Sequence, residues 1–307
     1  MRRLISAGAL ACAALLAGCA TDKIEGPDSR SAPSFDNGEN LASTYRYETF
    51  DVPGATTTIA WGINARGDVV GTYGDASGRF HGFVRQRDGF TAVDYPGAIR
   101  TELRGIGPAG DIAGAYARPG ELALNNFHGF VLTRHGEFVN VDYAPHTYTI
   151  AQRILPDGTV LGCYHDWDTM ITMHGIVVAG DDRQSLPQSG SMANGATPDG
   201  GRVTGLVSDM DGTSGFILED GVFTKFRVPG STSTSAWDMN PAGQIAGTFV
   251  NATGTHGFVR LGDNYTTLNV PAALATRGFG INARGEVVGS YTAAGKTHGY
   301  VATPASR

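Results

Sequence analysis

The 307-residue sequence lacks the short motifs that mark common catalytic sites. It has no Gly-x-Ser-x-Gly nucleophile turn, no His-Glu-x-x-His metal motif and no glycine-rich phosphate loop after a strand-like run. Basic residues are also few, because 23 Lys and Arg stand against 29 Asp and Glu. That balance argues against nucleic acid as a partner. No cofactor is predicted.

Cysteine is scarce as well. Cys12 and Cys19 lie near the N-terminus, so Cys163 stands alone in the rest of the chain. No disulfide framework is therefore available. Cys163 lies in the strand-like run 160–164, where we expect a small buried side chain rather than a nucleophile. Beyond residue 17 no apolar run is long enough to span a bilayer.

The first residues have the features of a targeting signal. Arg2 and Arg3 precede a short apolar run that ends in Leu16-Ala17-Gly18-Cys19. This order resembles a bacterial lipobox, which implies cleavage before Cys19 and lipidation of that residue. We therefore expect a signal peptide at 1–18 and a flexible, lipidated tether at 19–43, whose composition offers too little apolar surface to become ordered. The resemblance implies a lipid-anchored protein of the bacterial cell envelope. Because no Asp follows Cys19, the outer membrane is favoured.

Glycine is abundant, and much of it belongs to a phrase that the chain repeats six times. Each copy has a turn that ends in glycine, a β-rich run with a second glycine four residues on, and a His-Gly-aromatic run. We number the copies repeat 1 to repeat 6 by that second glycine, which is Gly71, Gly114, Gly162, Gly205, Gly247 and Gly289. The spacing of 42 to 48 residues fits four short strands with their turns, as in a propeller blade.

The turn in each repeat predicts where its strands lie. In repeat 5 the turn is Asn240-Pro241-Ala242-Gly243. Proline at the second position favours a type I turn, and glycine at the fourth supplies a positive φ. An inner strand precedes this turn and a second strand follows it. The third strand carries the His-Gly motif, and the fourth ends in a sequence such as Asp94-Tyr95-Pro96-Gly97.

The two ends of the repeat region complement each other. It begins with an orphan fourth strand at 45–53 and ends on a third strand at 298–303. Pairing of these segments would remove both sheet edges, whereas a linear solenoid would leave an edge open. We therefore predict an all-β fold over residues 44–304, a six-bladed β-propeller closed by pairing of the N-terminal strand with the last blade.

The third strands carry the most recognisable motif of the chain. It is His81-Gly82-Phe83 in repeat 1 and recurs around His128, His174, His256 and His298, whereas repeat 4 has Ser214. These motifs resemble the HAF-type extracellular repeat family over residues 45–303. The resemblance implies an exported repeat protein of propeller type with no established activity. With one histidine in each blade, we expect structural hydrogen bonds rather than catalysis.

Positions at which the repeats differ are candidates for a ligand site. Five residues before the turn glycine, four repeats have glycine, but repeat 3 has Arg153 and repeat 5 has Asp238. The predicted ligand-binding residues, placed around a central channel, are Trp61, Arg104, Gln152, Arg153, Asn194, Trp237 and Asp238. Aromatic faces beside hydrogen-bonding groups suit a sugar or another small polar ligand. The alternative is that the aromatics are core and that Arg153 pairs with Asp238.

Loops of repeats 2 and 3 make one face of the predicted ring irregular. The catalytic candidates there are His146, Tyr148, His165, Asp166 and Asp168. Histidines with carboxylates can hold a divalent metal, and His with Tyr can perform acid–base chemistry. Their spacing is not diagnostic, so no metal site is assigned. A solvated loop is the alternative.

We predict a lipid-anchored envelope propeller that binds a ligand, a glycan or an envelope protein through this loop face. The alternative is a metal-assisted hydrolase or lyase that acts on a carbohydrate or lactone at the same face. A purely structural envelope protein is a third hypothesis. In each case the membrane is a partner through lipidated Cys19.

Overall fold

The structure, a computed structural model, describes residues 44–87, 89–121, 126–143, 148–166 and 172–305. They belong to one compact unit, Ala42–Arg307. The predicted signal peptide, the tether and Cys19 lie outside the described residues. The described residues form strands and turns without a helix, so they contain no helical segment long and apolar enough to cross a membrane.

Each repeat forms an antiparallel meander. Repeats 1 to 3 comprise β2 (Thr57–Ile63), β3 (Val69–Gly74), β4 (Phe80–Gln86), β5 (Gly89–Val93), β6 (Arg100–Ile106), β7 (Ile112–Ala117), β8 (His128–Leu132), β9 (Phe138–Asn140), β10 (Tyr148–Ile154), β11 (Val160–His165), β12 (Met173–Ala179) and β13 (Asp182–Ser189). Repeats 4 to 6 comprise β14 (Ser191–Ala196), β15 (Arg202–Asp209), β16 (Gly212–Glu219), β17 (Val222–Phe226), β18 (Ser233–Met239), β19 (Ile245–Asn251), β20 (Gly254–Leu261), β21 (Asn264–Leu268), β22 (Ala275–Ile281), β23 (Val287–Ala293) and β24 (Lys296–Pro304).

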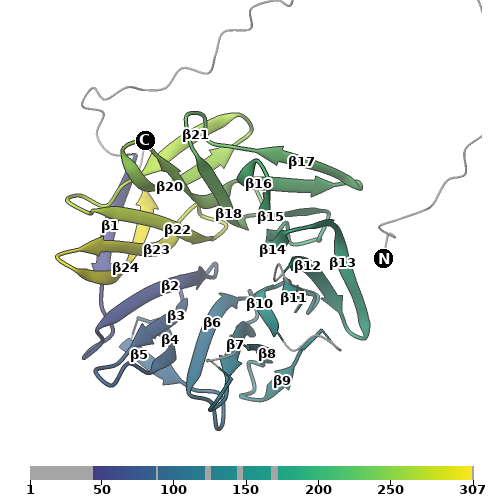
Figure 1. Cartoon of the computed structure of the whole chain (residues 1–307). Helices are drawn as coiled ribbons and strands as arrows, with labels where there is room; N and C mark the ends of the chain where they lie inside the picture. The colour runs from purple at the N-terminus through teal and green to yellow at the C-terminus, as the bar shows by residue number, and fades with distance from the viewer. Residues whose placement is uncertain (1–43, 88, 122–125, 144–147, 167–171, 306–307) are drawn as a thin grey trace, which may run out of the picture. The chain divides into compact units, whose positions relative to one another are not determined.

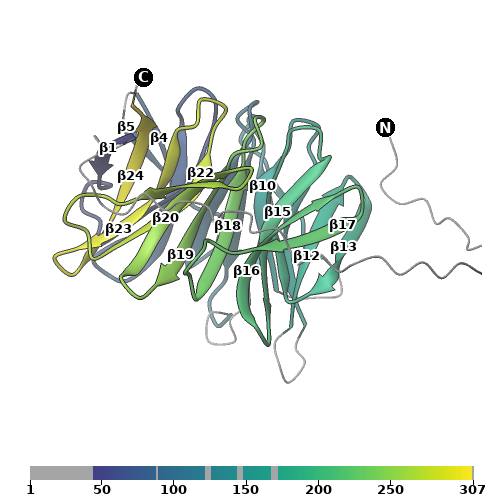
Figure 2. The same ribbon diagram turned by 90° about the horizontal axis from the view of Figure 1, so that it is seen from above.

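The repeats follow one another around a common centre, with the first strand of each repeat innermost (Figure 1). In the perpendicular view the sheets of successive repeats stand side by side (Figure 2). The core lies between them, since Val70 of repeat 1 packs in one cluster with Leu103 and Phe130 of repeat 2. This is the arrangement of a β-propeller, so the predicted all-β class and propeller architecture are confirmed for the described residues.

The first strand of the described chain lies beside the last. β1 (Tyr45–Phe50) pairs antiparallel with β24, with Arg46 opposite Thr303. Repeat 6 also meets repeat 1 through a parallel bridge between Thr57 of β2 and Thr297 of β24. The same kind of bridge joins other consecutive repeats, at Phe80–Arg100 and at Thr255–Ala275. These bridges link several meanders into one 16-stranded sheet.

The turns after the inner strands have the geometry that the sequence predicts. In repeat 1 the N–H of Gly67 donates to the carbonyl of Asn64 at 3.1 Å, and Gly67 has a φ of +90°. Just before each turn, however, the inner strand contains a β-bulge that the sequence did not predict. The residues skipped by the ladder are Trp61, Arg104, Gln152, Asn194, Trp237 and Phe279. A bulge leaves a residue unpaired and bends the strand.

In repeat 1 the repeat histidine connects the end of the fourth strand to the hairpin between the second and third strands. The Nδ1 atom of His81 lies 2.9 Å from a carboxylate oxygen of Asp94, at the end of the fourth strand, and Nε2 lies 3.3 Å from Asp75 in the β3–β4 hairpin. In repeat 4, where serine replaces histidine, Arg227 donates from Nε to the hydroxyl of Ser214 at 2.9 Å. This geometry agrees with the structural role expected for the motif.

Candidate ligand-binding cavity

Arg153 lies where the β-bulges of the inner strands meet. Its guanidinium donates to backbone carbonyls of bulge residues from five repeats. The acceptors are the carbonyl oxygens of Trp61 (3.1 Å), Arg104 (2.6 Å), Gln152 (2.8 Å), Trp237 (3.4 Å) and Phe279 (3.1 Å). Because the bulges take these residues out of the strand ladders, their carbonyls converge on one cation. Arg153 thereby joins the inner strands at the axis.

Asp238 supplies the matching anion. A carboxylate oxygen lies 3.2 Å from Nε of Arg153, and the N–H groups of Ile281 and Met239 donate to the same carboxylate. Burial raises the pKa of Asp238 above its ordinary value, although Arg153 opposes that shift. Gly105 makes room for this arrangement, because a Cβ there would lie 2.5 Å from the carbonyl oxygen of Gln152.

Arg153 and Asp238 pair with each other, which is the alternative considered from the sequence, and each is only 8% exposed. Their predicted role in ligand binding stays a prediction. Gln152 and Asn194 are also buried. Their side chains connect neighbouring repeats, through Met192 Sδ at 3.1 Å and the carbonyl of Ala236 at 2.8 Å. At the position of Arg153 and Asp238, repeat 3 supplies the cation and repeat 5 supplies the anion of a single ion pair, so the other four repeats can have glycine there.

A cavity of about 560 Å³ opens beside this axis, within repeats 5, 6 and 1. It is lined by Ile59, Trp61, Ser235, Trp237, Thr248, Arg277, Phe279, Ser290, Thr292 and Thr297. Its volume lies within the range of ordinary small-molecule sites. Because Thr292 and Thr297 flank the β23–β24 hairpin, the cavity extends toward the face that carries the hairpins between second and third strands.

Three aromatic rings lie together at the inner end of the cavity. The ring centroids of Trp61 and Phe279 are 4.2 Å apart, and Trp237 lies 5.7 Å from Trp61 and 5.3 Å from Phe279. The guanidinium of Arg104 covers the Trp61 ring at 4.0 Å. Two of the predicted ligand residues, Trp61 and Trp237, thus line the cavity, while Arg104 supports one of them.

The cavity walls are polar and come from positions that the sequence argument missed. Ser235 and Arg277 lie two residues before the bulge residues of β18 and β22, and hydroxyls are added by β19, β23 and β24. Ile59 occupies the equivalent position on β2. The sequence did contain a signal for these wall positions, because the residue three before the position of Arg153 and Asp238 also varies among the repeats. In repeats 1 to 6 it is Ile59, Glu102, Ile150, Met192, Ser235 and Arg277.

On the opposite side of the channel, an ion triplet centred on Glu102 occupies the position along the inner strand that Ser235 and Arg277 have in their repeats. Glu102, which is 2% exposed, accepts from Arg100 Nε at 2.6 Å and from the guanidinium of Arg104. Burial alone would raise the pKa of Glu102, but Arg104 and Arg100 outweigh it and hold the pKa below the ordinary value. This carboxylate is fully occupied by partners from its own strand.

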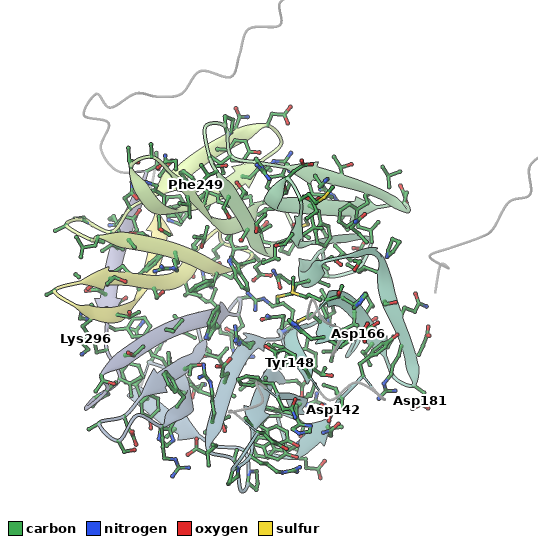
Figure 3. The ribbon with its side chains drawn as sticks, in the orientation of Figure 1. Asp142, Tyr148, Asp166, Asp181, Phe249 and Lys296 are labelled. Atoms are coloured by element: carbon green, nitrogen blue, oxygen red, sulfur yellow. The ribbon has the colours of Figure 1, made fainter. Side chains whose placement is uncertain are left out.

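Two of the predicted catalytic residues meet behind the triplet. Tyr148 lies opposite His165 in the β10–β11 ladder, with ring centroids 4.0 Å apart, and His165 Nε2 is 3.8 Å from Cys163 Sγ. Burial raises the pKa of both Tyr148 and Cys163 to about 12, and burial followed by the charge of His174 lowers the pKa of His165 to about 4. At neutral pH the three groups are uncharged. Figure 3 shows Tyr148 nearer the centre than Lys296 and Asp181, which mark the periphery.

The other catalytic candidates do not join this group. Asp166 lies 3.0 Å from Nε2 of His174 and is the hairpin partner of that repeat histidine. His146 and Asp168 lie outside the described residues. Within the described ranges no group of three or more His, Cys, Asp and Glu side chains is arranged to hold a metal ion. Hydrolase or lyase activity at this face stays a prediction.

Comparison with solved structures identifies the class of fold. Matches include a putative TolB from Agrobacterium tumefaciens (15% identity, TM-score 0.52, 67% of this chain and 74% of that chain). A gluconolactonase from Xanthomonas campestris matches at 12% identity and a TM-score of 0.53, over 84% and 89% of the two chains. The β-propeller domain of the trilobed protease from Pyrococcus furiosus matches at 9% and 0.50, over 81% and 96%.

At these identities the similarity shows the fold alone, and the chain is a β-propeller protein. Neither a scan against family models nor a search of curated proteins finds a match.

Proposed function

We propose that the chain is a closed six-bladed β-propeller of the HAF type. Two observations support closure. β1 supplies the outer strand that repeat 6 would otherwise lack, and the Thr57–Thr297 bridge repeats the contact made between other consecutive repeats. Six repeats of similar length then surround one axis, and the Arg153 guanidinium donates hydrogen bonds to backbone carbonyls from five of them.

Closure is tested by cross-linking the two ends of the ring. The double variant Arg46→Cys/Thr303→Cys places cysteines at directly opposed positions of β1 and β24. Such antiparallel pairs approach closely enough for a disulfide. We expect mild oxidation to form it in the folded protein, as mapped by peptide mass spectrometry. The control Arg87→Cys/Thr303→Cys should stay reduced, and equal behaviour of both variants would contradict closure.

We further propose that the protein binds a small ligand of sugar type in the cavity of repeats 5, 6 and 1. The observation that carries this proposal is the combination of an aromatic floor, Trp61, Trp237 and Phe279, with a wall of hydroxyl groups. Aromatic faces pack against the apolar C–H faces of a sugar ring, while hydroxyls of the wall exchange hydrogen bonds with ring hydroxyls. The opposite side of the channel, which the Arg100–Glu102–Arg104 triplet fills, offers neither feature.

Titration with a panel of mono- and disaccharides, followed by ligand-observed NMR and calorimetry, tests this binding site. Trp237→Ala should weaken the best ligand at least tenfold, which corresponds to about 1.4 kcal/mol. The control Val222→Ala truncates an exposed apolar side chain on β17 and should leave affinity unchanged. Binding that survives loss of Trp237 would place the site elsewhere.

The cavity would be presented from the bacterial envelope. We propose that Cys19 carries the lipid anchor in the outer membrane and that residues 19–43 are the tether; the lipobox sequence supports this. Labelling of cells with a fatty-acid analogue should mark the wild type and not Cys19→Ser. Fractionation should recover the labelled protein with the outer membrane. Label on Cys19→Ser would refute the anchor.

A further inference from the structure

We propose that Arg277 makes the cavity a receptor for an acidic sugar and that its guanidinium binds the ligand's carboxylate. The inference rests on the proposed sugar-binding function and adds a charge requirement to it. The ligand class is a mono- or disaccharide that contains a uronic acid.

Arg277 differs from the other charged residues of the channel in having no charged partner. Arg153 pairs with Asp238, while Arg100 and Arg104 pair with Glu102. Arg277 lines the cavity, is half-buried, and forms no ion pair with any residue in the described part of the chain. A half-buried guanidinium without an ion pair keeps its N–H donors available for an anion that enters the cavity.

The surroundings of Arg277 favour a carboxylate over a phosphate. A guanidinium presents a planar fork of N–H donors that matches the two oxygens of a carboxylate. One arginine balances one negative charge, and the remaining polar wall consists of hydroxyls, including Ser235, Ser290 and Thr292, rather than further cations. A dianionic phosphate would leave its second charge without a partner.

The floor adds a further donor that lacks a partner. The indole nitrogen of Trp61 is buried and has no hydrogen-bond acceptor among the described residues. A buried N–H without a partner costs free energy. A uronic acid brings an apolar ring face for the aromatics and several oxygens for the wall hydroxyls.

The test compares sugars that differ at C6, where a carboxylate or a phosphate ester takes the place of the neutral hydroxymethyl group. Purified full-length protein is titrated by calorimetry with methyl glucuronide (the O-methyl glycoside with a free carboxylate), methyl glucoside and glucose 6-phosphate, and with the galacturonate and galactose pair. We expect the uronate of a pair to bind the wild type at least tenfold more tightly than the neutral sugar. Arg277→Gln should reduce the uronate to the affinity of the neutral sugar, whereas Arg87→Gln, which removes an exposed arginine of the β4–β5 turn, should change nothing.

Each result separates this inference from the proposed function. Equal binding of charged and neutral sugars in the wild type would overturn the acidic-sugar inference and leave sugar binding intact. Tighter binding of glucose 6-phosphate than of uronate would overturn the carboxylate assignment. Failure of every sugar to bind would refute both proposals. The wild-type comparison does not depend on any variant, and Arg277→Lys provides a second, charge-conserving variant that should keep part of the preference without the planar fork.

Discussion

The two halves of the central channel are built on the same backbone but differ in what fills them. On the side of repeats 2 and 3, the inner strands carry the Glu102 triplet and Tyr148, and His165 packs against Tyr148 from β11. On the side of repeats 5, 6 and 1, it contains the cavity, with Ser235 and Arg277 at the positions equivalent to Glu102. The same bulge precedes the turn in every repeat, so the strand geometry does not account for the difference.

The comparison shows that the two halves differ in the residue types at two positions of each inner strand, the bulge residue and the residue two before it. In the filled half, charges are satisfied within the protein, as the Arg100–Glu102–Arg104 triplet shows. In the open half, the bulge residues are the aromatic Trp61, Trp237 and Phe279. The residue two before the bulge is serine in repeat 5 and, in repeat 6, an arginine without an ion pair among the described residues. We therefore expect the filled half to contribute mainly to stability, and the open half is the side for which we propose ligand binding.

Loss of Arg153 should have the largest effect, because this side chain joins both halves. Arg153→Leu leaves Asp238 buried without its cation and removes the donor for five carbonyls. Breaking a buried ion pair costs about 3–5 kcal/mol, and we expect the upper end here. Urea unfolding measures the change. Asp238→Asn combined with Arg153→Leu should cost less than the sum of the single variants, and strict additivity would contradict the pairing.

Glu102 and Arg277 provide a matched test of the comparison, since both are charged and occupy equivalent positions. Glu102→Leu leaves two arginines without their buried partner and should lower the free energy of unfolding by about 3 kcal/mol. Arg277→Leu removes a charge that has no partner, so stability should change by less than about 0.5 kcal/mol. Similar losses for both variants in urea unfolding would show that Arg277 is structural and would end the distinction between the halves.

The repeated sequence was sufficient to predict much of the fold. Turns such as Asn240–Gly243 and the His-Gly strands predicted four strands in each repeat, and the orphan segment near Tyr45 predicted a partner in the last strand. Comparison among repeats also found the level of the channel at which Trp61 and Trp237 lie. These inferences succeed because strand periodicity and turn chemistry are local properties of the sequence.

The role of Arg153 was not predictable in the same way. Its partners are backbone carbonyls, which have no sequence identity, and these converge only because of the bulges. The bulges occur in every repeat, so comparison among repeats could not reveal them. Arg277 was overlooked for another reason. Only the two variable positions nearest the turn were considered as ligand sites, at residues such as Trp237 and Asp238, although the cavity lining extends one further inward-facing residue along each strand.

Acid should weaken the filled half selectively. The pKa of Glu102 in the folded protein lies below its ordinary value of 4.5, so its contribution to stability is present above that pH and is lost as pH falls through the folded pKa. The difference in unfolding free energy between wild type and Glu102→Leu should be constant near neutral pH and shrink below about pH 4.5. The difference between wild type and Arg277→Leu should show no such change. Asp238 shifts in the opposite direction, which is why the comparison uses variants rather than the wild type alone.

The smallest effect is expected for the wall hydroxyl of Ser235. Ser235→Ala removes one hydrogen-bonding group from the cavity and should leave the free energy of unfolding within about 0.5 kcal/mol of the wild type. A single hydrogen bond contributes about 0.5–1.5 kcal/mol, so affinity for a uronate should fall about two- to tenfold in calorimetry. Ser185→Ala, an exposed serine on β13, is the control for the substitution itself. An affinity unchanged by Ser235→Ala would mean that the ligand contacts the β23 and β24 side of the cavity instead, since Thr292 and Thr297 supply the hydroxyls there. A loss of stability without loss of affinity would show that Ser235 belongs to the framework, as Glu102 does on the other side, and the open half would then be narrower than its lining suggests.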